Sequence, residues 1–209
     1  MHYCSLCGTE TSFFMECRGR KYLECKKCYS ISMSEEFYLT KEDELRRYKS
    51  HNNDVNDLGY NNFLLPVINE IKANQKSNDL GLDFGCGPGP LIVKKLKEEA
   101  YNIKLYDPFF EKDETPLQQK YEYIICTEVA EHFKSPASEF TKLKSLLKSG
   151  GTLYCLTGLV QKNINFADWH YKNDPTHVFF YSRDTFEWIK NNIGFMSLEF
   201  KGNLIILKL

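Results

Sequence analysis

Apolar and polar positions follow the periods of strands and helices from Leu80 toward the end of the chain. The pattern predicts a strand beginning at Leu80, a helix over 90–100, and strands over 102–107 and 121–126. A helix, a Gly-Gly turn and a further strand follow within 146–157. Strands that alternate with helices in this way form a parallel sheet with helices on its faces. The sequence therefore predicts an α/β fold built on a doubly wound, mostly parallel sheet.

Further patterns lie on either side of this core. The stretch 34–50 predicts a polar helix that begins at its first residue, a serine followed by two acids. Residues 61–71 carry a helical apolar stripe that should pack on the sheet. A capped helix is expected from Ser182, and the runs 196–200 and 203–209 predict a closing antiparallel hairpin.

The length and charge suit a globular domain with a small extra module. The chain has 209 residues and a formal net charge of −1. Proteins that mainly bind nucleic acid usually carry a basic surplus, so the charge argues against that partner unless a local basic patch supplies it. No apolar run approaches the ~18 residues that span a bilayer, and no leader-like segment opens the chain. We expect a cytoplasmic protein with no membrane partner; the sequence gives no oligomeric state.

Four of the eight cysteines have the spacing of a zinc ribbon. Cys4 and Cys7 form one C-x-x-C pair, and Cys25 and Cys28 form the second after 17 intervening residues. Each pair can place two thiolates on one side of a tight turn, and two such turns complete a tetrahedron around Zn²⁺. Disulfides would be unusual in a reducing compartment. We therefore expect a structural zinc held by these four residues.

These patterns divide the chain into three parts. A zinc ribbon is expected over 1–33, a helical linker or lid over 34–76, and the α/β domain over 77–209. No internal repeat or low-complexity tract interrupts them.

A glycine-rich turn ends the first predicted strand of the α/β domain. It reads Leu-Gly-Leu-Asp-Phe-Gly-Cys-Gly-Pro-Gly over 80–89, with glycines at 85, 87 and 89, and a helical pattern follows at once. Glycines there let backbone N–H groups approach a ligand, and the helix N-terminus behind them favours electronegative groups. Pro90 occupies the position of the third glycine in the dinucleotide motif G-x-G-x-x-G. The turn therefore predicts a nucleotide-type cofactor loop of another class.

Three later segments strengthen this interpretation. Asp107 ends the second strand, where an acid commonly accepts from two ribose hydroxyls. The sequence Thr-Glu-Val-Ala-Glu-His over 127–132 follows the next strand, and a Gly-Gly turn precedes the strand that ends near Thr157. Together with the glycine turn, these motifs resemble those of class I S-adenosylmethionine-dependent methyltransferases, in the same order, over 80–157.

The resemblance implies S-adenosylmethionine as cofactor and a set of binding residues for it. The strand end and turn would hold its amino-acid portion, the acid of the second strand its ribose, and the segment after the fourth family strand would lie beside it. The residues are Asp83, Phe84, Gly85, Cys86, Gly87, Asp107, Pro108, Thr127 and Glu128.

The chain departs from the family pattern after the second strand. Only 13 residues separate Asp107 from Tyr121. The family normally fits a helix and a third strand there, so we expect that strand to be shortened or absent. Phe109 or Phe110 could then supply an apolar wall in place of the usual adenine contact.

Three histidines are candidates for taking a proton from the methyl acceptor. His132 follows the fourth family strand, and His170 and His177 lie in the loop after the fifth, which often walls the acceptor pocket in this family. An imidazole is suited to proton transfer near neutral pH. Trp169 and Tyr171 lie in the same loop and are candidates for contacting substrate. A purely structural role for each histidine remains open.

Two further possibilities concern the same region. His170, Asp174 and His177 have the residue types of a second metal site, although they lack helical spacing. The segment before the first strand resembles the part of the family that covers the cofactor. Its candidate lid residues are His51, Asn52 and Tyr60.

The leading functional hypothesis is methyl transfer from S-adenosylmethionine to a small molecule or metabolite. Transfer is an in-line displacement, so positioning supplies much of the acceleration and a histidine could act as general base. One alternative is an RNA methyltransferase that docks its substrate on the zinc ribbon. Another is a non-catalytic adaptor that binds the cofactor.

Overall fold

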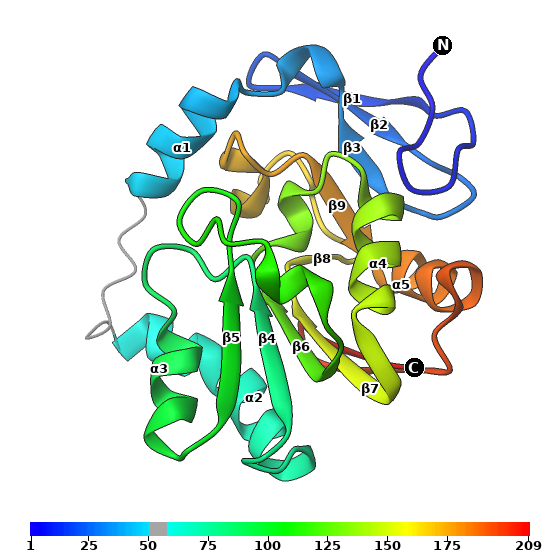
Figure 1. The fold of residues 1–209 in the computed structure, drawn as a ribbon. Coiled ribbons are helices and arrows are strands. Elements are labelled where there is room, and N and C mark those ends of the chain that lie inside the picture. Colours follow the sequence, from blue (N-terminus) through cyan, green and yellow to red (C-terminus); the bar gives the residue numbers. More distant parts are fainter. Residues whose placement is uncertain (51–57) are drawn as a thin grey trace.

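The computed structural model describes residues 1–50 and 58–209 (Figure 1). The strands are β1 (Ser12–Cys17), β2 (Arg20–Glu24), β3 (Ile31–Met33), β4 (Leu80–Phe84), β5 (Asn102–Tyr106), β6 (Tyr121–Thr127), β7 (Leu147–Leu156), β8 (Leu159–Val160), β9 (Phe179–Ser182), β10 (Ser197–Lys201) and β11 (Leu204–Lys208). The α-helices are α1 (Lys41–Lys49), α2 (Leu58–Asn74), α3 (Leu91–Glu98), α4 (Pro136–Ser145) and α5 (Arg183–Ile189). Short 3-10 segments are η1 (Glu35–Phe37), η2 (Thr115–Gln118), η3 (Ala130–His132) and η4 (His170–Asn173), and a π-helical turn, η5 (Lys190–Gly194), follows α5.

The larger sheet has the strand order β10-β11-β7-β6-β4-β5. Strands β5, β4, β6 and β7 are parallel, and β11 and β10 run antiparallel to them as the predicted closing hairpin. The predicted doubly wound, mostly parallel sheet is confirmed. Strand β5 is at the edge, and η2 is the regular element described between Asp107 and Tyr121. The third family strand is therefore absent from this part of the chain, because the connection is too short to cross a face of the sheet and return.

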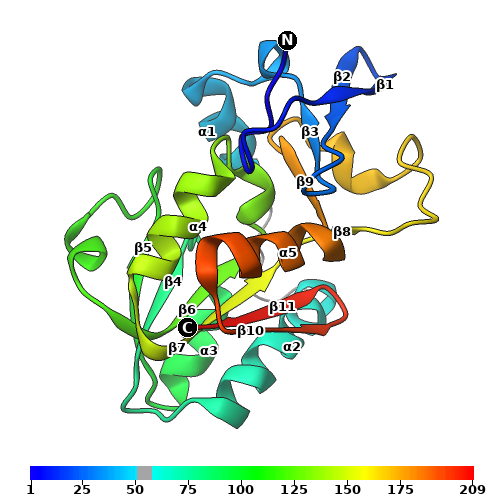
Figure 2. The same ribbon diagram turned by 90° about the vertical axis from the view of Figure 1, so that its right-hand side faces the viewer.

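Helices cover both faces of this sheet because its central strands bury alternate residues on opposite sides. Ile124 and Cys126 of β6 face the cluster that contains α4 and α5. Tyr123 and Ile125 face the cluster that contains α2 and α3. Figure 2 shows the two helix pairs on opposite sides of the sheet.

A second sheet joins the N-terminal ribbon to the segment after β7. Its order is β1-β2-β3-β9-β8, with Ile31 of β3 opposite Phe180 of β9. Tyr22, Phe166 and Phe180 pack edge to face in its small core. The ribbon is thus bonded to the chain segment that carries His177. In Figure 1 both lie at the end of the larger sheet to which β4 and β5 point.

Helix α1 begins later than the sequence pattern predicts. Ser34 precedes only the single turn η1, and Tyr38 is extended. Thr40 caps α1 instead, because its hydroxyl oxygen accepts from the N–H of Asp43 at 3.2 Å. Both sites have a hydroxyl followed by acids, so the local signal alone does not distinguish them.

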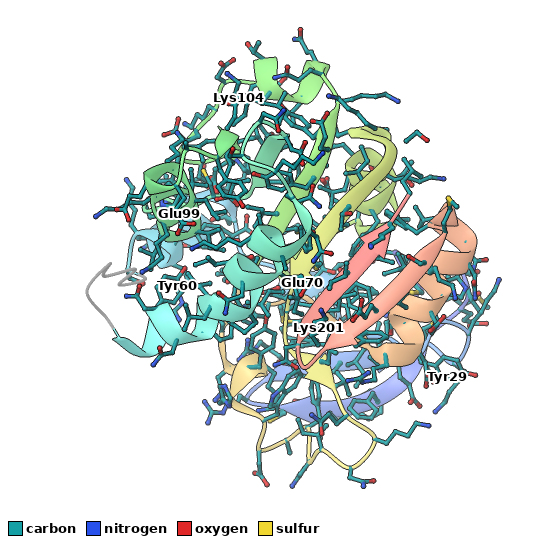
Figure 3. All side chains as sticks on the ribbon, turned by 90° about the horizontal axis from the view of Figure 1, so that it is seen from below. Tyr29, Tyr60, Glu70, Glu99, Lys104 and Lys201 are labelled. Carbon is teal, nitrogen blue, oxygen red and sulfur yellow. The ribbon has the colours of Figure 1, made fainter. Side chains whose placement is uncertain are left out.

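An ion pair connects helix α2 to β10, an edge strand of the larger sheet. The Lys201 ammonium lies 2.6 Å from a carboxylate oxygen of Glu70, and Figure 3 shows the two side chains together. Tyr60 lies in the first turn of α2, at the end of the helix opposite to Glu70 (Figure 3).

No helix in the described ranges combines the length and apolar character needed to cross a membrane.

Candidate active site

The glycine turn follows β4 and lies against β5. Gly85 and Gly87 have φ of 81° and 63°, in the left-handed region that favours glycine. The N–H groups of Gly85 and Cys86 both donate to the carbonyl oxygen of Tyr106, at 2.8 and 3.2 Å. A Cβ added at Gly85 would lie 2.5 Å from a methyl carbon of Val129. The turn is therefore packed closely against the segment that follows β6.

Asp107 holds this turn closed. Its buried carboxylate accepts from the N–H of Gly87 at 3.0 Å and from the N–H groups of Phe109 and Phe110 at 2.8 and 3.0 Å. A carboxylate has about four lone-pair sites, so three backbone donors leave about one for a ligand hydroxyl. Pro108, next to it, is exposed.

Asp83 is a second buried carboxylate beside the turn. Burial, and after it the charge of Asp107, raise its pKa to about 7. Phe84 and Cys86 are buried next to it, and burial also raises the pKa of the Cys86 thiol. An acid with this pKa is only partly ionised near neutral pH, and a bound cation would favour its ionised form.

The end of β6 brings further predicted residues to the turn. The Thr127 hydroxyl is buried and has no hydrogen-bond partner among the described residues. Glu128 has φ 53°, an uncommon value for a residue other than glycine, and its N–H donates to Leu156. Burial, then the carboxylates of Asp83 and Glu128, raise the pKa of Tyr60, which places the start of α2 near both acids.

His132 and His177 are brought together by the docking of η3 on the segment before β9. The Val178 N–H donates to the carbonyl oxygen of Glu131 at 2.9 Å. The His132 Nδ1 donates to the carbonyl oxygen of Thr176 at 2.9 Å. The two imidazole rings then lie edge to face, 4.8 Å between centroids.

Glu131, a residue with no role predicted from the sequence, lies close to both histidines. Its side chain is fully buried, and its Oε1 is 3.9 Å from the Nε2 of both His132 and His177. Its Oε2 accepts from the Thr157 hydroxyl at 2.8 Å. The available signal was its position immediately before His132 in the segment that follows β6.

Tyr171 connects this group to Glu128. Its hydroxyl donates to Glu128 Oε1 at 3.3 Å and lies 3.2 Å from the Thr157 hydroxyl. Burial, followed by the charge of Glu131, raises the pKa of Glu128 to about 9, although the Tyr171 hydrogen bond opposes the shift. Burial lowers the pKa of His177 to about 4, against the attraction of Glu131.

Of the candidates in the loop before β9, some contact the site and others do not. Trp169 packs on Tyr171, with ring centroids 5.1 Å apart. His170 is exposed, and the described contacts do not join it to the other histidines. Asp174 accepts from the Arg47 guanidinium at 2.8 Å and from the Thr176 hydroxyl at 2.6 Å. The alternative metal set of His170, Asp174 and His177 is therefore not assembled.

Helix α1 covers this region from the N-terminal side. Besides the Arg47 pair with Asp174, the Tyr48 ring packs edge to face on His132 and on Phe109, each at 5.3 Å. The predicted lid residues His51 and Asn52 lie outside the described residues.

The four predicted zinc ligands form a separate cluster. The sulfur atoms of Cys4, Cys7, Cys25 and Cys28 all lie within 4.8 Å of one another. Each pair ends in a turn with a left-handed residue, Gly8 at φ 69° and Tyr29 at φ 57°. Zn–S bonds of ~2.3 Å give tetrahedral edges of about 3.8 Å, so the cluster has the size of a zinc site.

A hollow of about 760 Å³ lies elsewhere, between the ribbon and α5. It is lined by residues that include Tyr29, Ile31 and Trp188. It shares no residue with the glycine turn or the histidine pair, so its volume gives no information on either.

The family model and the curated relatives that this chain matches are all methyltransferases. Residues 58–199 match a protein family described as a methyltransferase domain. A ubiquinone biosynthesis O-methyltransferase from Erwinia tasmaniensis is 26% identical over 91 residues, 44% of this chain and 37% of that protein. Its counterpart from Serratia proteamaculans is equally similar over 38% of its length. The match thus spans about two fifths of these curated relatives.

Two solved structures share the fold. A Burkholderia thailandensis 1,6-didemethyltoxoflavin-N1-methyltransferase, bound to its substrate and S-adenosylhomocysteine, has a TM-score of 0.57 and 10% identity over 94% of this chain and 98% of that one. A Haemonchus contortus phosphoethanolamine N-methyltransferase in complex with S-adenosyl-L-methionine has a TM-score of 0.54 and 16% identity over 76% of this chain and 42% of that one. At these identities the likeness concerns the fold.

Proposed function

The chain belongs to the methyltransferase-domain family matched over residues 58–199, and on that premise we propose that it transfers a methyl group from S-adenosylmethionine to a small-molecule acceptor. The observation that carries the proposal is the glycine turn closed by Asp107 beside the buried Asp83. In open α/β sheets, ligands bind outside the carboxyl ends of the strands, where both acids lie.

The residues around the turn fit this cofactor chemically. S-adenosylmethionine carries an ammonium and a sulfonium, and Asp83 is a buried carboxyl whose ionised form a cation would favour. The Thr127 hydroxyl, at the end of β6, has no hydrogen-bond partner within residues 1–50 and 58–209. Asp107 retains room for about one ribose hydroxyl.

The bound cofactor would supply a methyl group on a sulfonium, which is the electrophile of the reaction. Asp83 and the turn would hold its amino-acid portion, and Asp107 its ribose. His132 would accept the acceptor's proton at Nε2, because Nδ1 is already bonded to Thr176. His177 is a weak base, since burial lowers its pKa to about 4.

A small molecule is the acceptor class that the surroundings favour. Helix α1 covers the histidine pair through Tyr48 and through the ion pair of Arg47 with Asp174. The relatives also act on small molecules by name, on ubiquinone precursors or on didemethyltoxoflavin. The near-neutral chain offers no basic surplus for RNA.

The four-cysteine cluster would hold a structural zinc. Its role would be to stabilise β1–β3 and, through the pairing of β3 with β9, the segment that carries His177.

Calorimetric titration with S-adenosylmethionine tests the proposal. Asp107→Ala should weaken binding by about tenfold or more, because charge-assisted hydrogen bonds contribute ~1.5–3 kcal/mol. Asp113→Ala is the matched control, since this exposed acid in the same connection bonds only its neighbour Thr115 among the described residues. Equal affinity of wild type and Asp107→Ala, or no binding by the wild type, would contradict the proposal.

A further inference from the structure

We propose that Glu131, His132 and His177 form a binding site for a divalent transition-metal ion, distinct from the four-cysteine cluster. The inference rests on the proposed function, because the ion would bind an oxygen of the methyl acceptor. The ligand atoms of these three residues lie within 4.8 Å of one another.

The hydrogen bonds of both histidines decide which ring nitrogen carries the lone pair. A carbonyl oxygen only accepts, so Nδ1 of His132 must donate to Thr176 and Nδ1 of His177 must donate to Tyr171, at 2.9 and 2.7 Å. In the neutral rings Nε2 is then the unprotonated nitrogen. Metal-binding histidines usually have this arrangement, with the second nitrogen donating to a carbonyl or carboxylate.

Glu131 completes the set with an oxygen that lacks a partner. Its Oε1 is fully buried and has no hydrogen bond to any described residue. It is 3.9 Å from Nε2 of both His132 and His177, too far for a hydrogen bond. The three acceptor atoms surround one point, within 4.8 Å of one another, and the buried Glu131 oxygen among them has no hydrogen-bond partner in the described part of the chain. A cation at that point would satisfy all three.

The dimensions suit a metal after a small contraction. Bonds of ~2.0–2.2 Å to one ion place neighbouring ligands about 3–3.5 Å apart, somewhat less than the 3.9 Å found here. Thr157 already fixes Glu131 through Oε2, as outer-shell donors fix metal-binding carboxylates.

The ligand types indicate which ions would bind. Two imidazoles and one carboxylate suit Zn²⁺, Fe²⁺ or Mn²⁺ better than Ca²⁺, and they leave coordination positions open. Glu128, a half-buried acid, is joined to this group through Tyr171 and Thr157.

A metal here would make the methylated atom an oxygen. A hydroxyl of the acceptor, bound at an open position, would lose its proton to water more readily. The new O–CH₃ bond would form as the S–CH₃ bond breaks, with its electron pair going to sulfur. His132 would then be a ligand and would not take the proton itself, so the two roles exclude one another.

Titration of the zinc-loaded protein with Mn²⁺, followed by calorimetry and electron paramagnetic resonance, tests the site. One Mn²⁺ should bind per chain in addition to the zinc of the cysteine cluster. His132→Ala and His177→Ala should each weaken this binding by more than about 100-fold, because even outer-shell changes cost ~10–100-fold. His170→Ala, an exposed histidine of the same loop, should bind Mn²⁺ like the wild type.

The outcomes separate this inference from the proposed function. Thermal unfolding of each variant identifies any that fails to fold. If both histidine variants fail to fold, the wild-type titration alone decides. No binding of Mn²⁺ or additional Zn²⁺ to the wild type, or equal binding by the histidine variants, overturns the metal site. S-adenosylmethionine binding measured on the same samples decides the proposed function independently. If it persists without metal binding, His132 remains as the proton acceptor.

Discussion

At the scale of single residues, the backbone of Gly85 is the tightest requirement of the site. Its left-handed conformation and the contact of its missing Cβ with Val129 are two separate costs of any substitution. Gly202, in the turn between β10 and β11, has φ 65° but nothing within 4 Å of an added Cβ. Comparing substitutions at Gly85 and Gly202 therefore separates the cost of backbone strain from the cost of steric contact.

We predict that Gly85→Ala destabilises the protein more than Gly202→Ala. Both should lose about 1–2 kcal/mol of unfolding free energy for the left-handed conformation. Only Gly85→Ala must also displace Val129 and should weaken S-adenosylmethionine binding. Denaturant unfolding and calorimetry measure these effects, and equal losses for both variants would contradict the predicted contact.

Asp83 makes stability depend on pH. Its pKa in the folded protein is about 7, above the ordinary value of 3.8, so the folded state binds its proton more tightly than the unfolded state. Stability from this group is present below pH ~4 and falls as pH rises to about 7, by roughly 4 kcal/mol at 1.36 kcal/mol per pH unit. Asp83→Asn should remove that part of the slope. Unfolding free energies at pH 5 and pH 8 check it; parallel profiles for wild type and variant would count against the raised pKa.

At the scale of elements, most strands and helices were predictable because their signals are local. The short apolar run of β6 and the apolar stripe of α2 specify the element whatever packs on them. The missing third strand was also predictable, from the length of the connection after Asp107. The start of α1 was predicted wrongly at Ser34, and the pairing of β3 with β9 was not foreseen. Both depend on contacts between distant parts of the chain.

Helix α1 owes its position to such contacts. Arg47 donates through Nε and Nη2 to one carboxylate oxygen of Asp174, which is largely buried. Lys134 pairs with Glu44 of the same helix at 2.7 Å. These two ion pairs and the Tyr48 ring hold α1 over the histidines.

Removing the Arg47 side chain should loosen this cover. We expect Arg47→Ala to raise the KM for the acceptor several-fold while the affinity for S-adenosylmethionine changes little, and to speed hydrogen exchange over residues 41–49. Arg46→Ala is the matched control, because this exposed neighbour pairs only with Asp43 among the described residues. Indistinguishable exchange in the two variants would show that the pair with Asp174 does not fix the helix.

At the scale of the whole molecule, the ribbon and the α/β domain are coupled through one sheet. The β3–β9 pairing and the Ser182 hydroxyl, which donates to the Tyr29 carbonyl oxygen at 3.0 Å, connect the cysteine cluster to the chain around His177. Loss of the proposed zinc should therefore affect the active site as well as the ribbon.

We predict that Cys25→Ser lowers the melting temperature and increases hydrogen exchange in β9 as well as in β1–β3. Cys17→Ser should do neither, because Cys17 lies in the ribbon but outside the cluster. The expected loss is several kcal/mol, since structural zinc is bound with ~10–16 kcal/mol in small zinc domains. An effect confined to residues 1–33 would contradict the coupling.

The candidate site was predictable in its parts rather than in its assembly. The glycine turn, Asp107 and the cysteine spacing are local motifs, and the structure places the turn after β4, Asp107 after β5 and the four cysteines in one cluster. The convergence of His132 and His177 on Glu131 depends on η3 docking against the start of β9, through the Val178 N–H. No local sequence pattern predicts that contact. The sequence therefore indicated no role for Glu131, and it placed His170 beside His177 in the alternative metal set.

The central claim is that the turn after β4 binds S-adenosylmethionine. A crystal structure of the complex with S-adenosylhomocysteine tests it most directly. The account predicts the ribose against Asp107 and the amino-acid portion beside Asp83 and the Gly85–Gly87 backbone. A ligand bound elsewhere, or a site after β4 that stays empty at saturating ligand concentration, would contradict it.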